Sequence, residues 1–97
     1  MADCIFCKIA SGEIPSGKVY EDESVLAFRD LEPQAPKHIL IIPKKHIGSI
    51  MALTGADKEL AGHILTEVAP AVARSCGVDE GGFRLVANTG ADGGQTV

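Results

Sequence analysis

Cys4 and Cys7 are the first residues of this chain whose types and spacing could do chemistry. A Cys-x-x-Cys pair offers two of the roughly four ligands that a tetrahedral zinc ion takes. His38 or His46 could be a third ligand, and the fourth is not obvious in the sequence. Two inert, buried thiols fit the spacing equally well. A redox pair of the thioredoxin type fits less well, because the motif lies at the extreme N-terminus rather than after a strand.

A glycine-rich run, residues 88–97, is the second candidate. Its residues, Asn-Thr-Gly-Ala-Asp-Gly-Gly-Gln-Thr-Val, match neither the dinucleotide fingerprint nor the phosphate loop that ends in Gly-Lys-Ser/Thr. Glycines adopt positive φ angles and let the backbone approach a ligand closely. The amides of Gly94, Gln95 and Thr96 could therefore point at phosphate oxygens. Composition by itself favours the simpler interpretation, a flexible hairpin loop.

The histidines and Asp30 carry weaker signals. His38 begins an apolar run and His46 follows it, and a histidine at a strand end more often serves structure than catalysis. His63 lies off the apolar stripe of the predicted helix, so we expect it on the surface. Asp30 could accept hydrogen bonds from sugar hydroxyls, but its position at the end of a strand favours a turn. These residues form no recognisable Ser/His/Asp or Cys/His catalytic arrangement.

Length and composition restrict the class of protein. A chain of 97 residues with 45% apolar and 23% charged side chains is typical of one globular domain, which we predict over residues 1–97. The net charge of −4 provides no basic field for nucleic acid, so we expect no such partner. The sequence has neither a membrane-spanning stretch nor a signal-peptide pattern. Three cysteines, an odd number, argue against a secreted disulfide framework, and we expect a cytoplasmic protein.

The strands that would position these residues follow from the spacing of apolar side chains. Residues 18–21 and 24–29 are predicted to form a β-hairpin with a polar turn between them. Residues 38–42 are apolar on both faces, which is typical of a central strand that is covered on each side. Residues 83–88 are predicted to form a further strand.

One main helix is predicted over residues 56–76, where apolar side chains fall on a single stripe that includes Cys76. Thr54 can cap its start, and Gly77 can end it in a left-handed conformation. Pro70 removes one helical hydrogen bond, so we expect a kink or a break there. Strands, a helix and a further strand in this order predict an α+β fold, an antiparallel sheet meander with one main helix.

Five segments of the sequence together form a family pattern. In order they are residues 4–9 (Cys-Ile-Phe-Cys-Lys-Ile), 12–16 (Gly-Glu-Ile-Pro-Ser), 26–38 (Leu-Ala-Phe-Arg-Asp-Leu-Glu-Pro-Gln-Ala-Pro-Lys-His), 41–46 (Ile-Ile-Pro-Lys-Lys-His) and the glycine-rich run. The chain resembles the histidine triad family, in the nucleotide-binding branch that includes the purine nucleoside phosphoramidases. The resemblance covers essentially the whole chain. It implies a purine nucleotide ligand and a homodimer.

The resemblance also implies an activity, the hydrolysis of a nucleoside monophosphate from an amine or similar leaving group. In the family, a histidine of a His-x-His-x-His strand attacks phosphorus, and water then cleaves the nucleotidyl-histidine. That strand directly follows the Gly-Gln-Ser/Thr-Val stretch, where these residues end at Val97. We therefore expect these 97 residues to be inactive alone. We also expect residues 83–88 to find their partner strand elsewhere, because an unpaired strand leaves an open sheet edge.

Individual residues match family positions. Five apolar side chains match positions that enclose the base and ribose: Ile5, Phe6, Ile14, Phe28 and Leu40. Asp30 matches the residue that holds the ribose hydroxyls, and Asn88 one that orients the nucleophile. Gly94 and Thr96 match donors around the α-phosphate. His38 resembles a histidine that supports the absent ones.

In branch members with Cys-x-x-Cys, a structural zinc ion joins the two cysteines to two histidines. Cys4, Cys7 and His46 fit three of these ligands, and the fourth would lie beyond Val97. The reaction itself needs no metal. An alternative function is a non-catalytic module that binds nucleotides or is stabilised by zinc for interaction with a partner.

Overall fold

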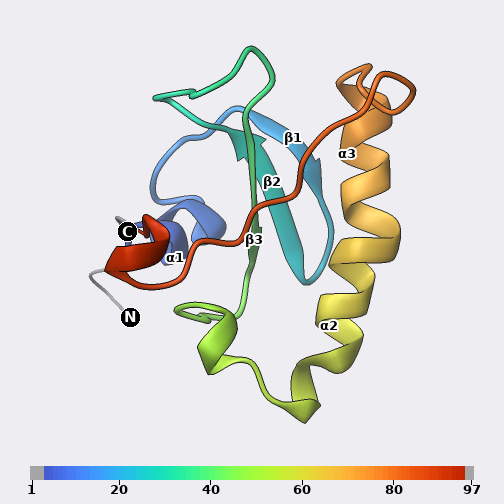
Figure 1. Cartoon of the computed structure of the whole chain (residues 1–97). Coiled ribbons are helices and arrows are strands. Elements are labelled where there is room, and N and C mark those ends of the chain that lie inside the picture. The colour runs from blue at the N-terminus through green and yellow to red at the C-terminus, as the bar shows by residue number, and fades with distance from the viewer. Residues whose placement is uncertain (1–3, 96–97) are drawn as a thin grey trace.

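A computed structural model describes residues 4–95 as a small antiparallel sheet with helices on both faces (Figure 1). Its helices and strands, in chain order, are α1 (Ile5–Ser11), β1 (Lys18–Glu21), β2 (Val25–Arg29), β3 (Ile39–Pro43), α2 (Lys58–His63) and α3 (Ala69–Ser75). α1 lies against one face of the sheet, and α2 and α3 form one long helix against the other. The predicted α+β fold with one main helix is confirmed. In this described part, no helix is long and apolar enough to cross a membrane.

β2 is the central strand of the sheet, whose order is β1-β2-β3 with antiparallel pairing throughout. Residues 25–28 are buried because both faces of β2 are covered, whereas β3 is mostly half-buried. The predicted hairpin of residues 18–21 and 24–29 is confirmed. The prediction that residues 38–42 form the central strand is wrong for residues 4–95. The sequence Val-Leu-Ala-Phe in β2 is equally apolar on both faces, so composition does not distinguish β2 from β3. In the sheet, β2 pairs with β1 on one edge and with β3 on the other.

Successive side chains along β2 point to opposite faces of the sheet, and this alternation divides the core into two clusters. Leu26 and Phe28 face α1 and pack against Ile9 and Ile42. The side chains that alternate with them, Val25 and Ala27, face the long helix and pack against Val68 and Val72. α1 and the long helix are therefore fixed in space through one strand.

Thr54 provides the predicted cap, in a capping box that begins the 3-10 turn Gly55–Asp57, and this turn leads directly into the long helix. The Oδ2 atom of Asp57 accepts the backbone N–H of Thr54 at 2.9 Å, and Thr54 Oγ1 accepts the N–H of Ala56 at 3.2 Å. Asp57 is buried, and its Oδ1 accepts a hydrogen bond from Lys45 Nζ at 2.7 Å. The ammonium of Lys45 and the amide of Thr54 together hold the pKa of Asp57 below its usual value. At the other end, Gly77 adopts the predicted left-handed conformation, with φ of 73°.

Pro70 disturbs the helix without breaking it. Residues Ile64–Val68 form a π-helical turn, and the N–H of Ala69 donates to the carbonyl of Ile64, five residues earlier. α3 then begins at Ala69 with Pro70 in its first turn, where a missing N–H costs little. The expected kink or break is therefore replaced by one wide turn, and the helical path continues (Figure 1).

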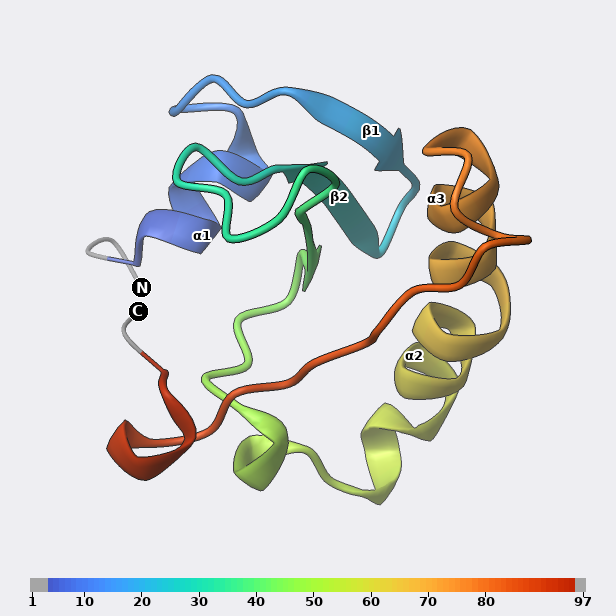
Figure 2. The same cartoon turned by 45° about the horizontal axis from the view of Figure 1, so that its top comes forward.

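Residues 83–88 do not form the predicted strand. They cross the molecule in extended form from the end of the long helix, and none of the residues in 4–95 pairs with them (Figure 2). Phe83, Leu85 and Val86 are 52%, 52% and 67% exposed. Strand propensity is present, but a strand forms only with a hydrogen-bonded neighbour. The partner strand that we expected is not among the described residues.

A hydrogen-bonded chain of side chains ties the hairpin turn to α2. Tyr20 OH donates to Asp22 Oδ2 at 2.6 Å, and the same oxygen lies 2.6 Å from His63 Nε2. His63 Nδ1 lies 2.6 Å from Glu67 Oε2. Desolvation opposes ionisation of Asp22, but hydrogen bonds from Tyr20, His63 and two backbone amides outweigh it and hold the pKa of Asp22 well below its usual range. Hydrogen bonds to Asp22 and then Glu67 raise the pKa of His63. His63 is thus half-buried and paired, not a free surface residue.

The stability of the chain should depend on pH through this network. Below the ordinary histidine pKa of 6.5, His63 is charged in both the folded and unfolded states, and its ion pairs contribute fully. That contribution is lost as pH rises through the raised pKa of folded His63. The contribution of Asp22 is present above its ordinary pKa of 3.8 and is lost only as pH falls through the much lower folded value.

We expect His63→Gln to lower the melting temperature more at about pH 5.5 than at about pH 9, because only the protonated imidazole gains from both carboxylates. Thermal unfolding followed by circular dichroism across this range measures the difference. Glu67→Gln is the matched control: its side chain is 69% exposed, so its effect should be smaller. Equal destabilisation by His63→Gln at both pH values would contradict the assignment.

Candidate functional site

The face of the sheet that carries α1 presents a partly open apolar cluster. Phe6, Ile14 and Leu40 are half-buried and pack against a core that includes Phe28. The ring centroids of Phe6 and Phe28 lie 6.5 Å apart with an interplanar angle of 49°. Ile5, which like Phe6 belongs to α1, is 46% exposed. Aromatic and aliphatic side chains that remain accessible in this way are suited to contact a flat apolar ring.

Asp30 lies immediately after β2, and its two carboxylate oxygens have different neighbours. Its Oδ1 accepts the backbone N–H of Glu32 at 2.9 Å, which is a turn of the kind favoured by its position. Its Oδ2 lies 3.5 Å from His38 Nε2. His38 Nδ1 accepts the N–H of Gln34 at 2.9 Å, so the neutral ring carries its proton on Nε2, facing Asp30. His38 therefore lies within ion-pair distance of the Asp30 carboxylate.

Residues 90–95 of the glycine-rich run form a hydrogen-bonded loop. A 3-10 turn, Ala91–Gly93, is flanked by Gly90 and Gly94 with φ of 70° and 80°, values that favour glycine. The side chain of Gln95 accepts the N–H of Gly90 and donates to the carbonyl of Gly48, both at 2.7 Å. The loop is thereby fixed to the segment that follows β3. Sequence reasoning considered only the amide of Gln95 and missed this role, because Gly48 is 47 residues away.

Of the predicted phosphate-side residues, the structure describes Asn88 and Gly94. Asn88 and Gly94 are exposed, and the N–H of Gly94 donates to the carbonyl of Ala91 within its own loop. Thr96, the other predicted donor, lies outside the described residues. The structure therefore brings together the apolar residues, and separately Asp30 with His38.

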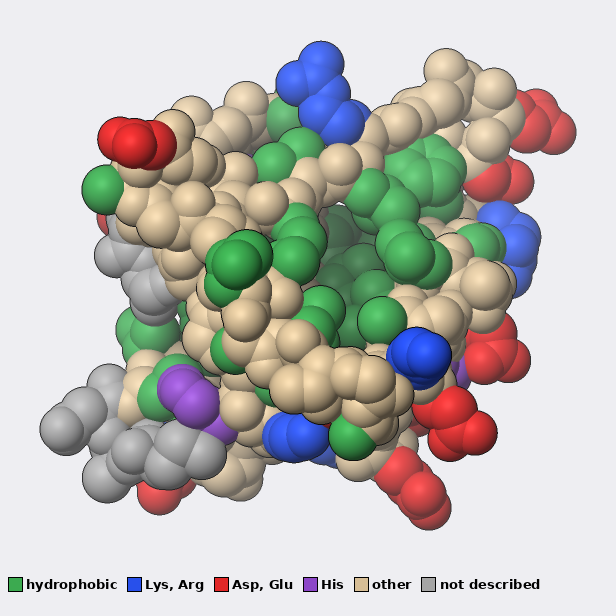
Figure 3. Space-filling model, turned by 60° about the horizontal axis from the view of Figure 1, so that its bottom comes forward, with side chains coloured by type: hydrophobic (Ala, Val, Ile, Leu, Met, Phe, Trp, Pro, Cys, Tyr) green, Lys and Arg blue, Asp and Glu red, His purple; other side chains and the backbone are tan. Residues whose placement is uncertain are grey.

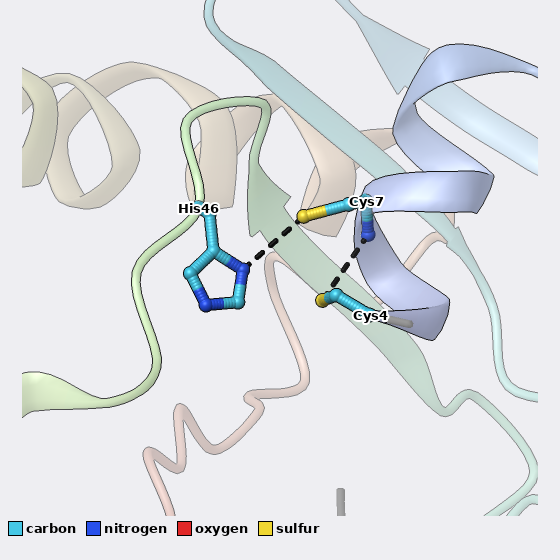
Figure 4. Close-up of side chains that lie close together, drawn as sticks. All are labelled: Cys4, Cys7 and His46. Carbon is cyan, nitrogen blue, oxygen red and sulfur yellow. Dashed lines mark hydrogen bonds between the residues drawn. The ribbon is translucent and has the colours of Figure 1, made fainter. Parts of the chain in front are cut away.

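A second cluster forms where α1 begins (Figure 4). Cys4 is the N-cap residue of α1, and its Sγ accepts the N–H of Cys7 at 3.4 Å. Cys7 Sγ lies 3.2 Å from Nδ1 of His46, which follows β3. The backbone hydrogen bond from Cys7 lowers the pKa of the Cys4 thiol, and the hydrogen bond with the Cys4 side chain raises the pKa of the Cys7 thiol.

The geometry of this cluster fits a metal ion. The two sulfurs and one imidazole nitrogen all lie within 4.8 Å of one another. Tetrahedral zinc, with Zn–S bonds of about 2.3 Å and Zn–N bonds of about 2.0 Å, holds such ligands about 3.5 to 3.8 Å apart. Small side-chain rotations reach these values. The spacing of residues in the sequence does not decide whether His38 or His46 is the third ligand. The fold places His46 beside the cysteines and His38 beside Asp30.

Comparison with known proteins gives consistent matches along the chain. A family model described as "Scavenger mRNA decapping enzyme C-term binding" matches residues 3–97. An uncharacterized HIT-like protein of Synechococcus elongatus is 52% identical over 95 residues, which are 98% of this chain and 82% of that protein. The purine nucleoside phosphoramidase of Escherichia coli K12 is 45% identical over 95 residues, which are 98% of this chain and 79% of that enzyme.

Solved structures agree with these matches. A histidine triad protein from Clostridium difficile has a TM-score of 0.94 and 52% identity, covering 100% of this chain and 84% of that one. A HIT family hydrolase from Legionella pneumophila has a TM-score of 0.93 and 53% identity, covering 98% of this chain and 84% of that one.

Proposed function

This chain belongs to the histidine triad family, and from that premise we propose that it binds a purine nucleotide and serves in the hydrolysis of nucleoside phosphoramidates. A relative at 45% identity is named for that activity, and a structural neighbour is described as a hydrolase. The expected cytoplasmic location, the nucleotide partner and the homodimer remain predictions.

The observation that carries the proposal is the placement of Asp30 relative to Phe28. Alternate residues along a strand point to one face, so Phe28 and the residue two positions on share the side that carries α1. Phe6, which packs against the buried Phe28, would contact the base. Asp30, held by Glu32 and His38, would accept hydrogen bonds from the ribose hydroxyls. A base and its ribose are adjacent in a nucleoside, and Asp30 follows the end of β2, two positions after Phe28.

The phosphate would lie toward the glycine-rich run. The Gly94 N–H, which donates to Ala91 in its own loop, would have to change partner to join Thr96 in stabilising charge on the phosphoryl oxygens. Asn88 would orient the nucleophilic imidazole. The imidazole nitrogen attacks phosphorus, the amine leaves with a proton, and water then releases the nucleotide from the histidine. The role of this chain is to bind and orient the nucleotide.

We place the nucleophile on a strand that pairs with β3. Among residues 4–95 the outer edge of β3 is free. A cavity of about 90 Å³ lies along it, lined by Ile39 and Ile41 of β3 and by Phe83 and Leu85 of the crossing segment. Hydrophobic side chains also gather around a hollow on this side of the molecule (Figure 3). A strand with alternating apolar residues would cover these side chains and turn its other residues toward the face that carries α1.

The cysteine cluster supports a second component of the proposal, a structural zinc ion held by Cys4, Cys7 and His46. When bound, zinc would supply a cross-link between α1 and the segment after β3. A non-catalytic module that binds nucleotide or uses zinc for stability is the alternative function.

The 97-residue chain should not hydrolyse adenosine phosphoramidate, because none of its residues matches the nucleophile. Supplying the His-x-His-x-His strand, as an extension of the chain, should give turnover and a nucleotidyl-histidine that mass spectrometry detects. Turnover by verified 1–97 protein would contradict the assignment of the nucleophile. An inactive extended protein that binds nucleotide would favour the non-catalytic alternative.

Asp30→Ala in the extended protein should weaken nucleotide binding by about 1.5 to 3 kcal/mol, the range for hydrogen bonds to a charged group. Isothermal calorimetry with adenosine monophosphate measures the change. Asp79→Ala removes the same charge from an exposed turn after α3 and serves as the control. Unchanged affinity in Asp30→Ala would leave Asp30 a turn residue only.

The extended protein, purified without chelator, should contain about one zinc ion per chain. Elemental analysis of Cys4→Ser should show loss of that metal, whereas Cys76→Ser should keep it, because Cys76 packs on the long-helix side of the sheet. Metal-free protein, with an unchanged melting temperature in Cys4→Ser, would show that these thiols are inert.

A further inference from the structure

The arrangement of Cys4 and Cys7 suits a second chemistry besides metal binding. Cys4 caps α1 and Cys7 is the third residue of that helix, so both sulfurs belong to one turn. They lie within 4.8 Å of each other, and both residues are half-buried and reachable from solvent. Residues one helical turn apart have Cα atoms about 5 to 6 Å apart, within the range that a disulfide requires. Rotation of the side chains alone can close the bond.

We propose that Cys4 and Cys7 are a redox modification site, at which a peroxide generates a reversible disulfide. One thiolate attacks the peroxide with uptake of a proton, forming a sulfenic acid and releasing water from hydrogen peroxide. The second thiolate attacks the sulfenic sulfur, the S–S bond forms, and the hydroxyl group takes a proton and leaves as water. The two cysteines are oxidised by two electrons in total, and the peroxide is reduced. A dithiol reductant reverses the step by exchange.

The disulfide and the metal exclude each other, an extension that rests on the proposed zinc site. Both states use the same sulfur electrons, and His46 cannot hold an ion without the thiolates. His46 lies 39 residues along the chain from Cys7, so the metal is a long-range cross-link, whereas the disulfide closes only one helical turn. Oxidation therefore frees α1 from the segment after β3.

The residues between the two cysteines connect this modification to the ligand face. Ile5 and Phe6 separate Cys4 from Cys7, and Phe6 packs against the cluster that contains Phe28. A change at the cysteines thus reaches the residues that we propose to contact the base. Cys76 takes no part, because it packs on the opposite face of the sheet with the long helix.

Trypsin gives a direct measurement of this proposal, because Cys4 and Cys7 share the peptide that ends at Lys8 while Cys76 lies in the peptide that ends at Arg84. Reduced chain is treated with hydrogen peroxide, quenched by alkylation and digested without reductant. We expect the first peptide to lose about 2 Da and to resist alkylation until dithiothreitol is added. The second peptide should remain alkylated. Sulfinic or sulfonic products without a disulfide, or a bridge to Cys76, would overturn the proposal.

The metal dependence is measured by adding zinc chloride to a free concentration of about ten times the dissociation constant of zinc. If only the metal-free cysteine pair reacts with peroxide, disulfide formation should then slow about tenfold. Release of zinc, followed with a colorimetric chelator, should keep pace with disulfide formation. His46→Ala keeps both thiols but loses a ligand, so zinc should protect it far less. Equal rates with and without bound zinc would overturn the mutual exclusion. A disulfide in a chain that binds no zinc would support the redox site and contradict the proposed metal site.

Discussion

Burial of β2 on both faces is the constraint on which the rest of this structure depends. Four consecutive apolar residues, 25–28, lose their contact with water only if something covers each side of the strand. Because successive side chains point in opposite directions, one set holds α1 and the other holds the long helix. β1 and β3 satisfy the backbone of β2 by pairing on its two edges. The face that carries α1, where we propose the ligand to bind, is therefore separated from the face that carries the long helix by a single strand.

Polar interactions then connect the elements that β2 cannot fix by itself. Asp22 in the hairpin turn is bound to His63 of α2, and the buried Asp57 joins Lys45 after β3 to the start of the long helix. Each carboxylate accepts several hydrogen bonds, which outweigh its desolvation and keep it ionised. These pairs lie on the side of the long helix, away from α1. They contribute to the position of that helix against the sheet.

The α1 side is organised by residues that each meet a partner far along the chain. Cys7 meets His46, Phe6 meets Phe28, and Gln95 meets Gly48. α1 thus contributes to the apolar cluster and to the cysteine cluster at once. A helix of only seven residues is marginal without tertiary contacts, so the position of α1 depends on these contacts.

The sequence by itself determined the local features: the hairpin of residues 18–29, the cap at Thr54, the left-handed Gly77 and a disturbance at Pro70. Each depends on residues within a few positions of one another, so their spacing suffices to predict them. The tertiary structure alone decided which strand is central, that His46 rather than His38 joins the cysteines, and that His63 pairs with Asp22 across 41 residues. Residues 83–88 have strand propensity but no neighbour to pair with among residues 4–95. Pairing across long sequence separations depends on where the folded chain brings each segment, and residue spacing does not contain that information.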